Sequence, residues 1–367
     1  MTRFNMRPLA RSLAAAAIVA ALTLPAAPAG ADPVTTPADR VFVVEVNMGW
    51  NSQGGGDYKS ESFFRRLAET GSTALTYKPD FVIANEVLNA PRDDDPDKWH
   101  DKYGFRNKLE EFVGGEWSWV HSDEKGQGVF FRSDRFELVG EKRQWHEKTG
   151  ANCDEGAHGM NEVAGRFRSK VGKEGDVFVA AVHFDWHYQC VYENVKKTAE
   201  QMDAWSARPM TIVGGDFNEP KESATGDPQT WRIENDPSCW WKDFYGEDNP
   251  CRSDFGAHYY DAVNVARYNG GTGVNAPICA EWTKSNSYRS TNDNANQCNS
   301  DKRRTSFIWA RWENSNGAAI DDPNASPGRI EGASADRGYW IDNDSSTEDI
   351  KVHRYSDHRA VRAVISF

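Results

Sequence analysis

Short apolar stretches separated by turn residues recur along most of the chain. They are rich in Val, Ile and Phe, and Gly, Asn, Asp or Pro residues interrupt them. Runs of this kind predict β-strands, because a strand buried on one or both faces needs apolar side chains only over a short length. The predicted strands are residues 41–46, 81–84, 128–131, 136–139, 163–168, 177–183, 210–214, 305–310 and 360–367.

Two other segments have the spacing of amphipathic helices. Apolar residues recur every three or four positions in 60–76 and again in 191–207, which is the period of one helical face. The segments 221–300 and 311–350 are polar and rich in Asn, Asp, Ser and Gly, so we expect long surface loops there. Many strands with few helices predict an α/β fold of layered sheets covered by helices.

The composition is that of a globular protein with an acidic surface. Of 367 residues, 38% are hydrophobic and 27% are charged, which excludes a disordered, collagen-like or coiled-coil chain. The formal net charge of −12 argues against broad, non-specific capture of polyanions. A phosphate-bearing substrate is not excluded, because a bound divalent cation reverses the sign of the local electric field.

The beginning of the chain has the order of a secretory signal. Arg3, Arg7 and Arg11 precede an apolar run over 13–24, and small residues follow up to Ala31. We therefore expect a signal peptide over 1–31, a linker over 32–40 and one domain over 41–367, secreted to the extracellular space. The alternative is a disordered leader rich in Ala and Pro.

Six cysteines follow this segment, and an even number in an exported chain predicts three disulfides. If strands 163–168 and 177–183 form a hairpin with Phe167 near Val179, the first two cysteines lie nearly opposite each other. Short loops would join the other four in sequence order, although sequence alone leaves other pairings open. The favoured pairs are Cys153–Cys190, Cys239–Cys251 and Cys279–Cys298.

Polar residues suited to metal and proton chemistry stand where the predicted strands end. Each alone is more often a turn or capping residue. Together they provide carboxylates, amides and two imidazoles at rigid strand ends, where functional side chains are common. The set is Asn47, Glu86, His183, Asp216, Asn218, Asp357 and His358.

Oxygen donors dominate this set. Glu86, Asp216 and Asp357 supply carboxylates, the ligands that Mg²⁺ and Ca²⁺ prefer and Zn²⁺ does not. His183 and His358 are candidate proton carriers. A divalent metal with two imidazoles suits attack of water on phosphorus: the metal stabilises charge on a phosphoryl oxygen, one His deprotonates the water, and the other protonates the leaving oxygen.

The order of these motifs along the chain is also informative. They are Asn47, Ala84-Asn85-Glu86-Val87, Val182-His183-Phe184, Gly214-Gly215-Asp216-Phe217-Asn218 and Tyr355-Ser356-Asp357-His358. This order resembles the endonuclease/exonuclease/phosphatase superfamily, which includes deoxyribonuclease I and bacterial sphingomyelinases, over about 41–367. The resemblance implies a four-layer α/β-sandwich of two packed, mainly antiparallel β-sheets flanked by helices.

The resemblance implies roles for the individual residues as well. In that scheme His358 is the general base, and His183 binds a phosphate oxygen or assists the leaving group. Asp216 and Asn218 orient the water or the phosphate. The implied metal ligands, for Mg²⁺ or alternatively Ca²⁺ or Mn²⁺, are Asn47, Glu86 and Asp357.

Two regions depart from the family pattern. The strand residue that is usually an Asp orienting the base histidine is Ser306 here, and a hydroxyl orients an imidazole without supplying charge. Where deoxyribonuclease I places an arginine before a strand, this chain offers Asn161 and Arg166 as candidate substrate contacts. Trp186, close after His183, is a candidate wall of the cleft.

These observations predict a secreted, divalent-metal-dependent phosphodiester hydrolase of the deoxyribonuclease I type. Its favoured substrate is nucleic acid, and we expect a monomer with no obligate protein partner. The alternatives are a phosphodiesterase acting on a phospholipid or sphingomyelin headgroup, a small-molecule phosphatase, and a non-catalytic binding protein on the same scaffold. Ser306 is the best support for the binding protein, whereas two imidazoles beside carboxylates oppose it.

Overall fold

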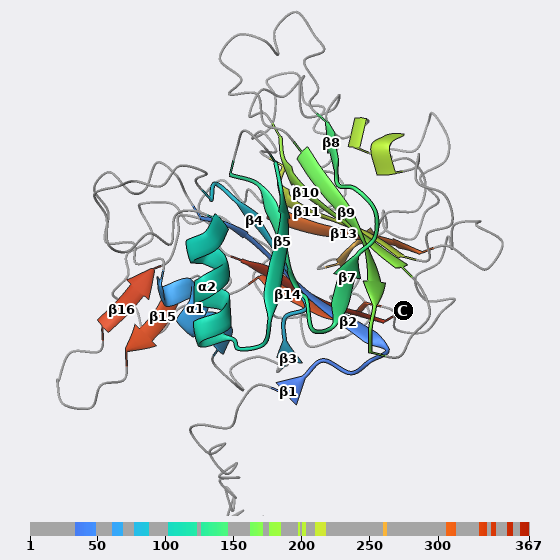
Figure 1. Ribbon diagram of the computed structural model, residues 1–367. Helices are drawn as coiled ribbons and strands as arrows, with labels where there is room; N and C mark the ends of the chain where they lie inside the picture. Colours follow the sequence, from blue (N-terminus) through green and yellow to red (C-terminus); the bar gives the residue numbers. More distant parts are fainter. Residues whose placement is uncertain are drawn as a thin grey trace, which may run out of the picture. The chain divides into compact units, whose positions relative to one another are not determined.

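Two β-sheets contain most of the described residues of this computed structural model (Figure 1). The structure describes residues 34–48, 61–68, 77–87, 102–122, 126–145, 162–171, 176–184, 197–198, 200–202, 210–217, 260–262, 306–312, 330–335, 339–342, 351–354 and 360–366. Contacts divide the chain into Met1–Ala31 and Asp32–Phe367, and all of these residues lie in the second unit.

The first sheet is built around one parallel pair of strands. β2 and β4 run parallel at its centre, while the other neighbouring strands are antiparallel. Its order is β14 (Ile330–Ala335), β17 (Val361–Ser366), β2 (Arg40–Asn47), β4 (Phe81–Asn85), β6 (Gly128–Arg132) and β5 (Trp117–His121).

The second sheet repeats this plan. β10 and β11 form its parallel pair, and the remaining neighbours are antiparallel. Its order is β12 (Tyr260–Asp261), β13 (Ser306–Trp312), β11 (Met210–Asp216), β10 (Asp176–His183), β9 (Glu162–Ser169) and β7 (Phe136–Leu138), with β8 (Arg143–Trp145) also paired to β9. Two small sheets join β1 (Val34–Thr35) to β3 (Tyr77–Lys78) and β15 (Tyr339–Asp342) to β16 (Lys351–Arg354).

Alternation along the strands divides the apolar residues between separate cores. Val41 and Val43 of β2 pack between the two sheets, against residues such as Val179 and Ile212 of the second sheet. Val44 and Val46, which point the other way, pack in the core that also contains the helical residues. The two sheets therefore share one apolar layer, and each has a second core on its outer face.

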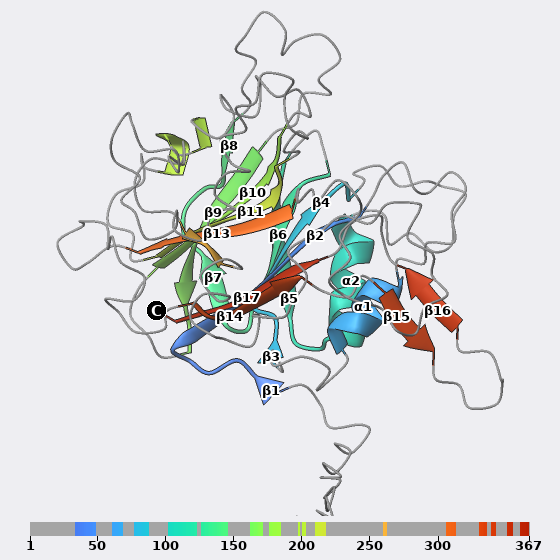
Figure 2. The ribbon, with the colours of Figure 1, turned by 180° about the vertical axis from the view of Figure 1, so that it is seen from behind.

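Two helices cover the outer face of the first sheet, α1 (Glu61–Ala68) and α2 (Lys102–Phe112). The rings of Phe63 and Phe64 of α1 and Phe105 of α2 pack edge-on or tilted against one another there, and Phe105 also contacts Phe130 of β6. Figure 2, from behind, shows the same two helices beside this sheet, with the β15–β16 hairpin next to α1. The predicted α/β-sandwich is confirmed.

Most strand predictions are confirmed, and the misses have physical reasons. Each segment predicted as a strand contains an observed strand, and α1 lies within the helix predicted over 60–76. In 191–207 the described residues 197–198 and 200–202 are helical. The prediction of a loop over 311–350 is wrong at β14 and β15. Backbone pairing with β17 holds the small and polar residues of β14 in a strand, and β15 is a short strand that pairs with β16.

The remaining differences also follow from tertiary pairing. The elements α2, β3, β5, β8, β12 and β16 were not predicted, and β12 makes the predicted loop over 221–300 wrong at Tyr260–Asp261, which pair with β13. Within the expected linker, β1 pairs with β3, and Thr36 Oγ1 donates to the Lys78 carbonyl at 2.8 Å. The β9–β10 register pairs Phe167 with Val177 rather than with Val179. All six cysteines, and with them the disulfide predictions, lie outside the described residues.

Gly215 allows β11 to approach β10 closely. Its φ is 150°, and a Cβ atom built there would lie 1.8 Å from the Val182 carbonyl oxygen. Gly215→Ala should therefore lower the free energy of unfolding by about 3 kcal/mol, through steric overlap and backbone strain. Gly140→Ala is the matched control, because its φ is 76° but no atom lies within 4 Å of the added Cβ. Urea denaturation giving equal losses for both variants would contradict the close approach.

A buried ion pair stands at the start of β4. Asp80 Oδ2 accepts the Phe42 N–H at 2.9 Å, and Asp80 Oδ1 lies 2.6 Å from Arg135 Nε. Burial raises the pKa of Asp80 from 3.8 to about 6, against the opposing effect of the Arg135 guanidinium. Between these pKa values the native state holds more protons than the unfolded state, so the stabilisation from Asp80 falls as pH rises.

Asp80→Asn should remove this pH dependence. At about 1.4 kcal/mol per pKa unit, the stability of the wild type relative to the variant should fall by about 3 kcal/mol from below pH ~4 to above pH ~6. Urea denaturation of both proteins over that range measures the difference. A difference that stays constant with pH would contradict the raised pKa.

Among the residues that the structure describes, no helix is both long and apolar enough to cross a membrane.

Candidate metal centre

The candidate site forms where the two parallel strand pairs end. Asn47 at the end of β2 is paired with Asn85 of β4, and His183 at the end of β10 is paired with Asp216 of β11. Alternation directs Asn47, His183 and Asp216 to the layer between the sheets, the side on which Val43, Ala181 and Ile212 pack. Four strand ends from two sheets therefore meet at one place.

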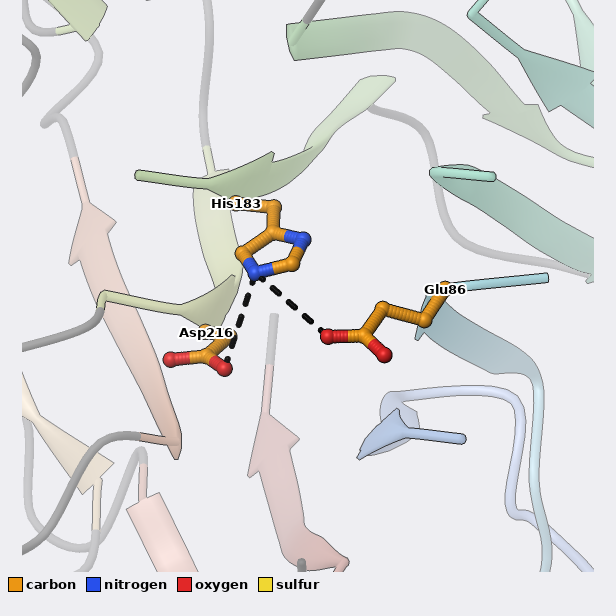
Figure 3. Close-up of side chains that lie close together, drawn as sticks. All are labelled: Glu86, His183 and Asp216. Atoms are coloured by element: carbon orange, nitrogen blue, oxygen red, sulfur yellow. Dashed lines mark ion pairs between the residues drawn. The ribbon is translucent and has the colours of Figure 1, made fainter. Parts of the chain in front are cut away.

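The polar side chains at these ends contact one another directly. Asn47 Nδ2 donates to Glu86 Oε1 at 3.1 Å and to Asp216 Oδ2 at 2.8 Å. His183 Nε2 lies 3.8 Å from Glu86 Oε1 and 3.7 Å from Asp216 Oδ2. Figure 3 shows the imidazole of His183 facing both carboxylates. The Asn47 amide thus bridges the two carboxylates, and the imidazole lies beside both.

Glu86 reaches this cluster through an unusual backbone conformation. Its φ is 58°, in the left-handed region that L-residues rarely adopt. Asn85 already faces the layer between the sheets, so a regular strand would turn the next side chain toward the helices. The left-handed turn instead brings Glu86 toward His183 (Figure 3). Such conformations cost roughly 1–3 kcal/mol and concentrate at functional sites.

The cluster is buried on one side and open on the other. Asn47 and Asp216 are almost fully buried, whereas the Glu86 side chain is 21% exposed. Burying carboxylates is unfavourable unless positive charge or hydrogen-bond donors compensate. The open side at Glu86 leaves an approach from solvent to these carboxylates.

The donor set fits a divalent cation. Glu86, His183 and Asp216 each offer one ligand atom, and these atoms lie within 4.8 Å of one another. Ligands on opposite sides of one Ca²⁺ are about 5 Å apart, so an ion of that size spans the cluster, whereas Mg²⁺, with opposite ligands about 4.2 Å apart, would draw the ligand atoms slightly closer. Two carboxylate oxygens favour a hard cation, and the imidazole is compatible with Mn²⁺ as well.

Two further buried acids lie next to the cluster and were not predicted: Glu162, on the outer face of the second sheet, and Glu45, on the side of the cluster. Glu162, at the start of β9, accepts a hydrogen bond from the backbone N–H of His183, and burial raises its pKa well above the usual range. Glu45 of β2 is fully buried and accepts a hydrogen bond from Asn85 Nδ2 at 3.5 Å. The available signal was an acidic residue inside an otherwise apolar strand, as in Val43-Val44-Glu45-Val46.

The structure brings some predicted site residues together but not all. Asn47, Glu86, His183 and Asp216 form the cluster, and Ser306, fully buried, is the backbone partner of Asp216. Those outside the described residues are Asn161, Trp186, Asn218, Asp357 and His358.

Arg166 does not join the cluster. Register places it opposite Phe178, five residues before His183 on β10. Its guanidinium pairs with Asp176 and lies over the Phe178 ring. Alternation puts it on the outer face of the sheet, away from the layer that contains His183.

Solved structures similar to this chain include proteins of the endonuclease/exonuclease/phosphatase family. A family protein from Bacteroides thetaiotaomicron superposes with a TM-score of 0.51 at 13% identity, covering 89% of this chain and 98% of that one. The mannosyl-6-phosphatase of the same organism has a TM-score of 0.51 at 13% identity, covering 89% and 100%. A family protein from Leptotrichia buccalis has a TM-score of 0.50 at 14% identity, covering 89% and 100%.

These likenesses establish the fold that the sequence motifs imply. No family model matches the chain, and a search of the curated proteins finds no similar sequence.

Proposed function

We propose that the protein is a divalent-metal-dependent phosphoester hydrolase, and more specifically a phosphodiesterase that acts on nucleic acid. One observation carries the proposal: two carboxylates, Glu86 and Asp216, and the imidazole of His183 meet within 4.8 Å at facing strand ends. The fold, shared with phosphatases of the family, supports the same chemistry.

Each residue of the cluster has a defined task in this proposal. Glu86 and Asp216 hold the cation, and Asn47 fixes both carboxylates by donating to each of them. A cation held by these residues would supply positive charge that stabilises a phosphoryl oxygen as negative charge develops. His183 faces the same carboxylates with Nε2, and from there it donates a hydrogen bond to a phosphoryl oxygen or protonates the leaving oxygen.

The remaining parts of the proposal come from the sequence. His358 is the proposed general base, and Asp357 and Asn218 complete the metal and phosphate contacts. The secretory signal supports export, and the six cysteines support three disulfides in the exported protein. Because the formal net charge is −12, the attraction of a polyanionic substrate would come mainly from the bound cation.

A second candidate function is phosphomonoester hydrolysis on a sugar phosphate. The similarity to the mannosyl-6-phosphatase favours it. The position of Arg166 favours it as well. Arg166 was predicted to contact a nucleic-acid backbone, but its guanidinium pairs with Asp176. Both candidates use the same metal centre and differ in the ester that reaches it.

A parallel assay separates the candidates. The full chain is incubated with Mg²⁺ and plasmid DNA, RNA, sphingomyelin vesicles or mannose 6-phosphate, each also with EDTA. Nicking of plasmid that EDTA abolishes supports the phosphodiesterase, and phosphate release from the sugar phosphate alone supports the second candidate. Sphingomyelin cleavage alone would replace nucleic acid with a lipid headgroup. If none of these substrates were hydrolysed, the proposed activity would be wrong and a binding protein would be favoured.

A further inference from the structure

The turn that carries Glu86 lies against the beginning of β6. Ala84 of β4 is paired with Gly128 of β6, and just beyond this pair the Val87 N–H donates to the Gly126 carbonyl at 2.8 Å. One chain has an extra residue between these two contacts, which is the definition of a β-bulge. Two residues therefore stand opposite one, namely Asn85 and Glu86 opposite Gln127.

Gly126 allows the two chains to approach closely at this bulge. A Cβ atom built on Gly126 would lie 2.1 Å from the Val87 carbonyl oxygen, a distance that no side chain could tolerate. Neighbouring strands are about 4.8 Å apart, so the backbone of Gln127 lies roughly one such spacing from that of Glu86. Gln127 is therefore a neighbour of the metal cluster in the first sheet.

The side chain of Gln127 faces the layer between the sheets, as the cluster does. Val129, two positions later, packs in that layer, and alternation places Gln127 on the same face. The left-handed φ of Glu86 directs its carboxylate to this layer as well. Gln127 is 2% exposed, so its amide lies in the wall of the site rather than on the open surface.

One hydrogen bond sets the direction of this amide. Ser122 Oγ donates to Gln127 Oε1 at 3.2 Å, and the Ser122 N–H donates to the Gln127 carbonyl at 3.0 Å. Ser122 directly follows β5, which is on the far side of β6 from β4. Because the amide oxygen is engaged on that side, Nε2 is directed toward β4 and Glu86. A donor is also the group that a neighbouring carboxylate favours there.

The Nε2 group has donors to spare. Among the residues that the structure describes, Ser122 is the hydrogen-bond partner of the Gln127 side chain, and it contacts the oxygen only. A nearly buried N–H group needs an acceptor, because leaving it unpaired costs its lost hydration. An anionic oxygen bound at the cluster would supply one, and hydrogen bonds to charged acceptors are the stronger kind.

We propose that Gln127 is a substrate-binding residue, whose Nε2 donates a hydrogen bond to a phosphoryl oxygen of the ester at the metal centre. This inference rests on the proposed function, because it assumes that a phosphate group reaches Glu86 and Asp216. Gln127 approaches the phosphate from the first sheet, whereas His183 approaches it from the second. Removing the amide should weaken phosphate binding while the groups that hold the cation stay in place.

Direct phosphate binding tests this role. Inorganic phosphate is the probe, and isothermal titration calorimetry of the full-length protein in saturating Mg²⁺ measures its affinity. Gln127→Met keeps the length of the side chain but removes both N–H groups. The loss of one hydrogen bond to a charged group should weaken phosphate binding about tenfold. Gln127→Glu keeps the acceptor for Ser122 Oγ and should weaken it further, because a carboxylate repels phosphate.

A second measurement separates substrate binding from a merely structural role. The electron paramagnetic resonance signal of free Mn²⁺, recorded without phosphate, should give Gln127→Met the Mn²⁺ affinity of the wild type. Gln201→Met is the matched control, because it makes the same change beside Met202, which packs on the outer face of the second sheet. This control should keep wild-type affinity for phosphate. Circular dichroism reports whether each variant is folded, and Gln127→Glu decides the question if Gln127→Met fails to fold.

The outcomes distinguish this inference from the function on which it rests. Wild-type phosphate affinity in the Gln127 variant, or an equal loss in Gln201→Met, overturns the role of Gln127 while the metal centre stands. An equal loss of Mn²⁺ affinity in Gln127→Met overturns it too, because the amide would then support the metal ligands. A wild-type protein that binds no phosphate in Mg²⁺ overturns the proposed function itself. A loss of phosphate affinity confined to the Gln127 variants, with Mn²⁺ bound as in the wild type, supports the inference.

Discussion

Replacing Glu86 by Gln should lower kcat/KM for phosphoester hydrolysis by at least about a hundredfold, the scale expected when a charged group at a reacting centre is removed. Gln has the same length and can still accept the hydrogen bond from Asn47 Nδ2. The fold should therefore survive, and the loss should come from the missing charge on the cation. Rates measured over a range of Mg²⁺ concentrations should show a higher requirement for the metal.

The control for Glu86→Gln is the same change at an exposed position. Glu116 is exposed and directly precedes β5, and Glu116→Gln should retain full activity. If Glu86→Gln also retained it, Glu86 would not hold a catalytic metal. If both variants lost activity alike, the effect would not be specific to the site.

Replacing His183 by Gln should lower kcat by roughly 10²–10⁴-fold, the usual contribution of a positioned acid or base. The imidazole is 5% exposed and lies within 4 Å of both carboxylates, so Gln fills a similar volume beside them. Because the two carboxylates remain, cation affinity should fall much less than in Glu86→Gln. Steady-state kinetics together with Mn²⁺ titration separates the two effects.

The Mn²⁺ titration decides the role of His183. A large loss of kcat with nearly unchanged Mn²⁺ affinity identifies it as the hydrogen-bond donor to the substrate. An equal loss of Mn²⁺ affinity in both variants would make His183 a metal ligand instead. Unchanged kcat would remove His183 from the reaction.

The sequence predicted the described part of the site well, because its signals are local. Asn47, His183 and Asp216 each end an apolar strand of β-period, and strands of this kind were recognisable from composition alone. The inference that these strand ends belong to two different sheets required the resemblance of the motifs to a known family. Periodicity does not specify which strands pair.

What the sequence could not predict depends on pairing and on backbone geometry. The left-handed conformation of Glu86 is not a property of Asn85-Glu86 by itself, and without it the carboxylate would face the helices. Arg166 was a candidate substrate contact until register and alternation placed it on the outer face. Glu45 gave only the signal of an acid within an apolar strand, because its burial becomes visible only when β4 and β17 flank it.

The arrangement of parallel strands explains why one site forms here. Carboxyl ends of neighbouring parallel strands lie at the same edge of a sheet, and each sheet contains one such pair. Packing the sheets face to face brings Asn47 and Asp216 into hydrogen-bond contact. The apolar layer between the sheets therefore ends in a polar cluster that it holds rigidly, which catalysis by positioned charges requires.

The most direct test is a crystal of the full-length protein equilibrated with Mn²⁺ and examined by anomalous diffraction at the manganese edge. We expect a peak between the carboxylates of Glu86 and Asp216, within about 2.5 Å of at least one oxygen of each. A peak bound elsewhere, with these carboxylates free of metal at saturating Mn²⁺, would contradict it.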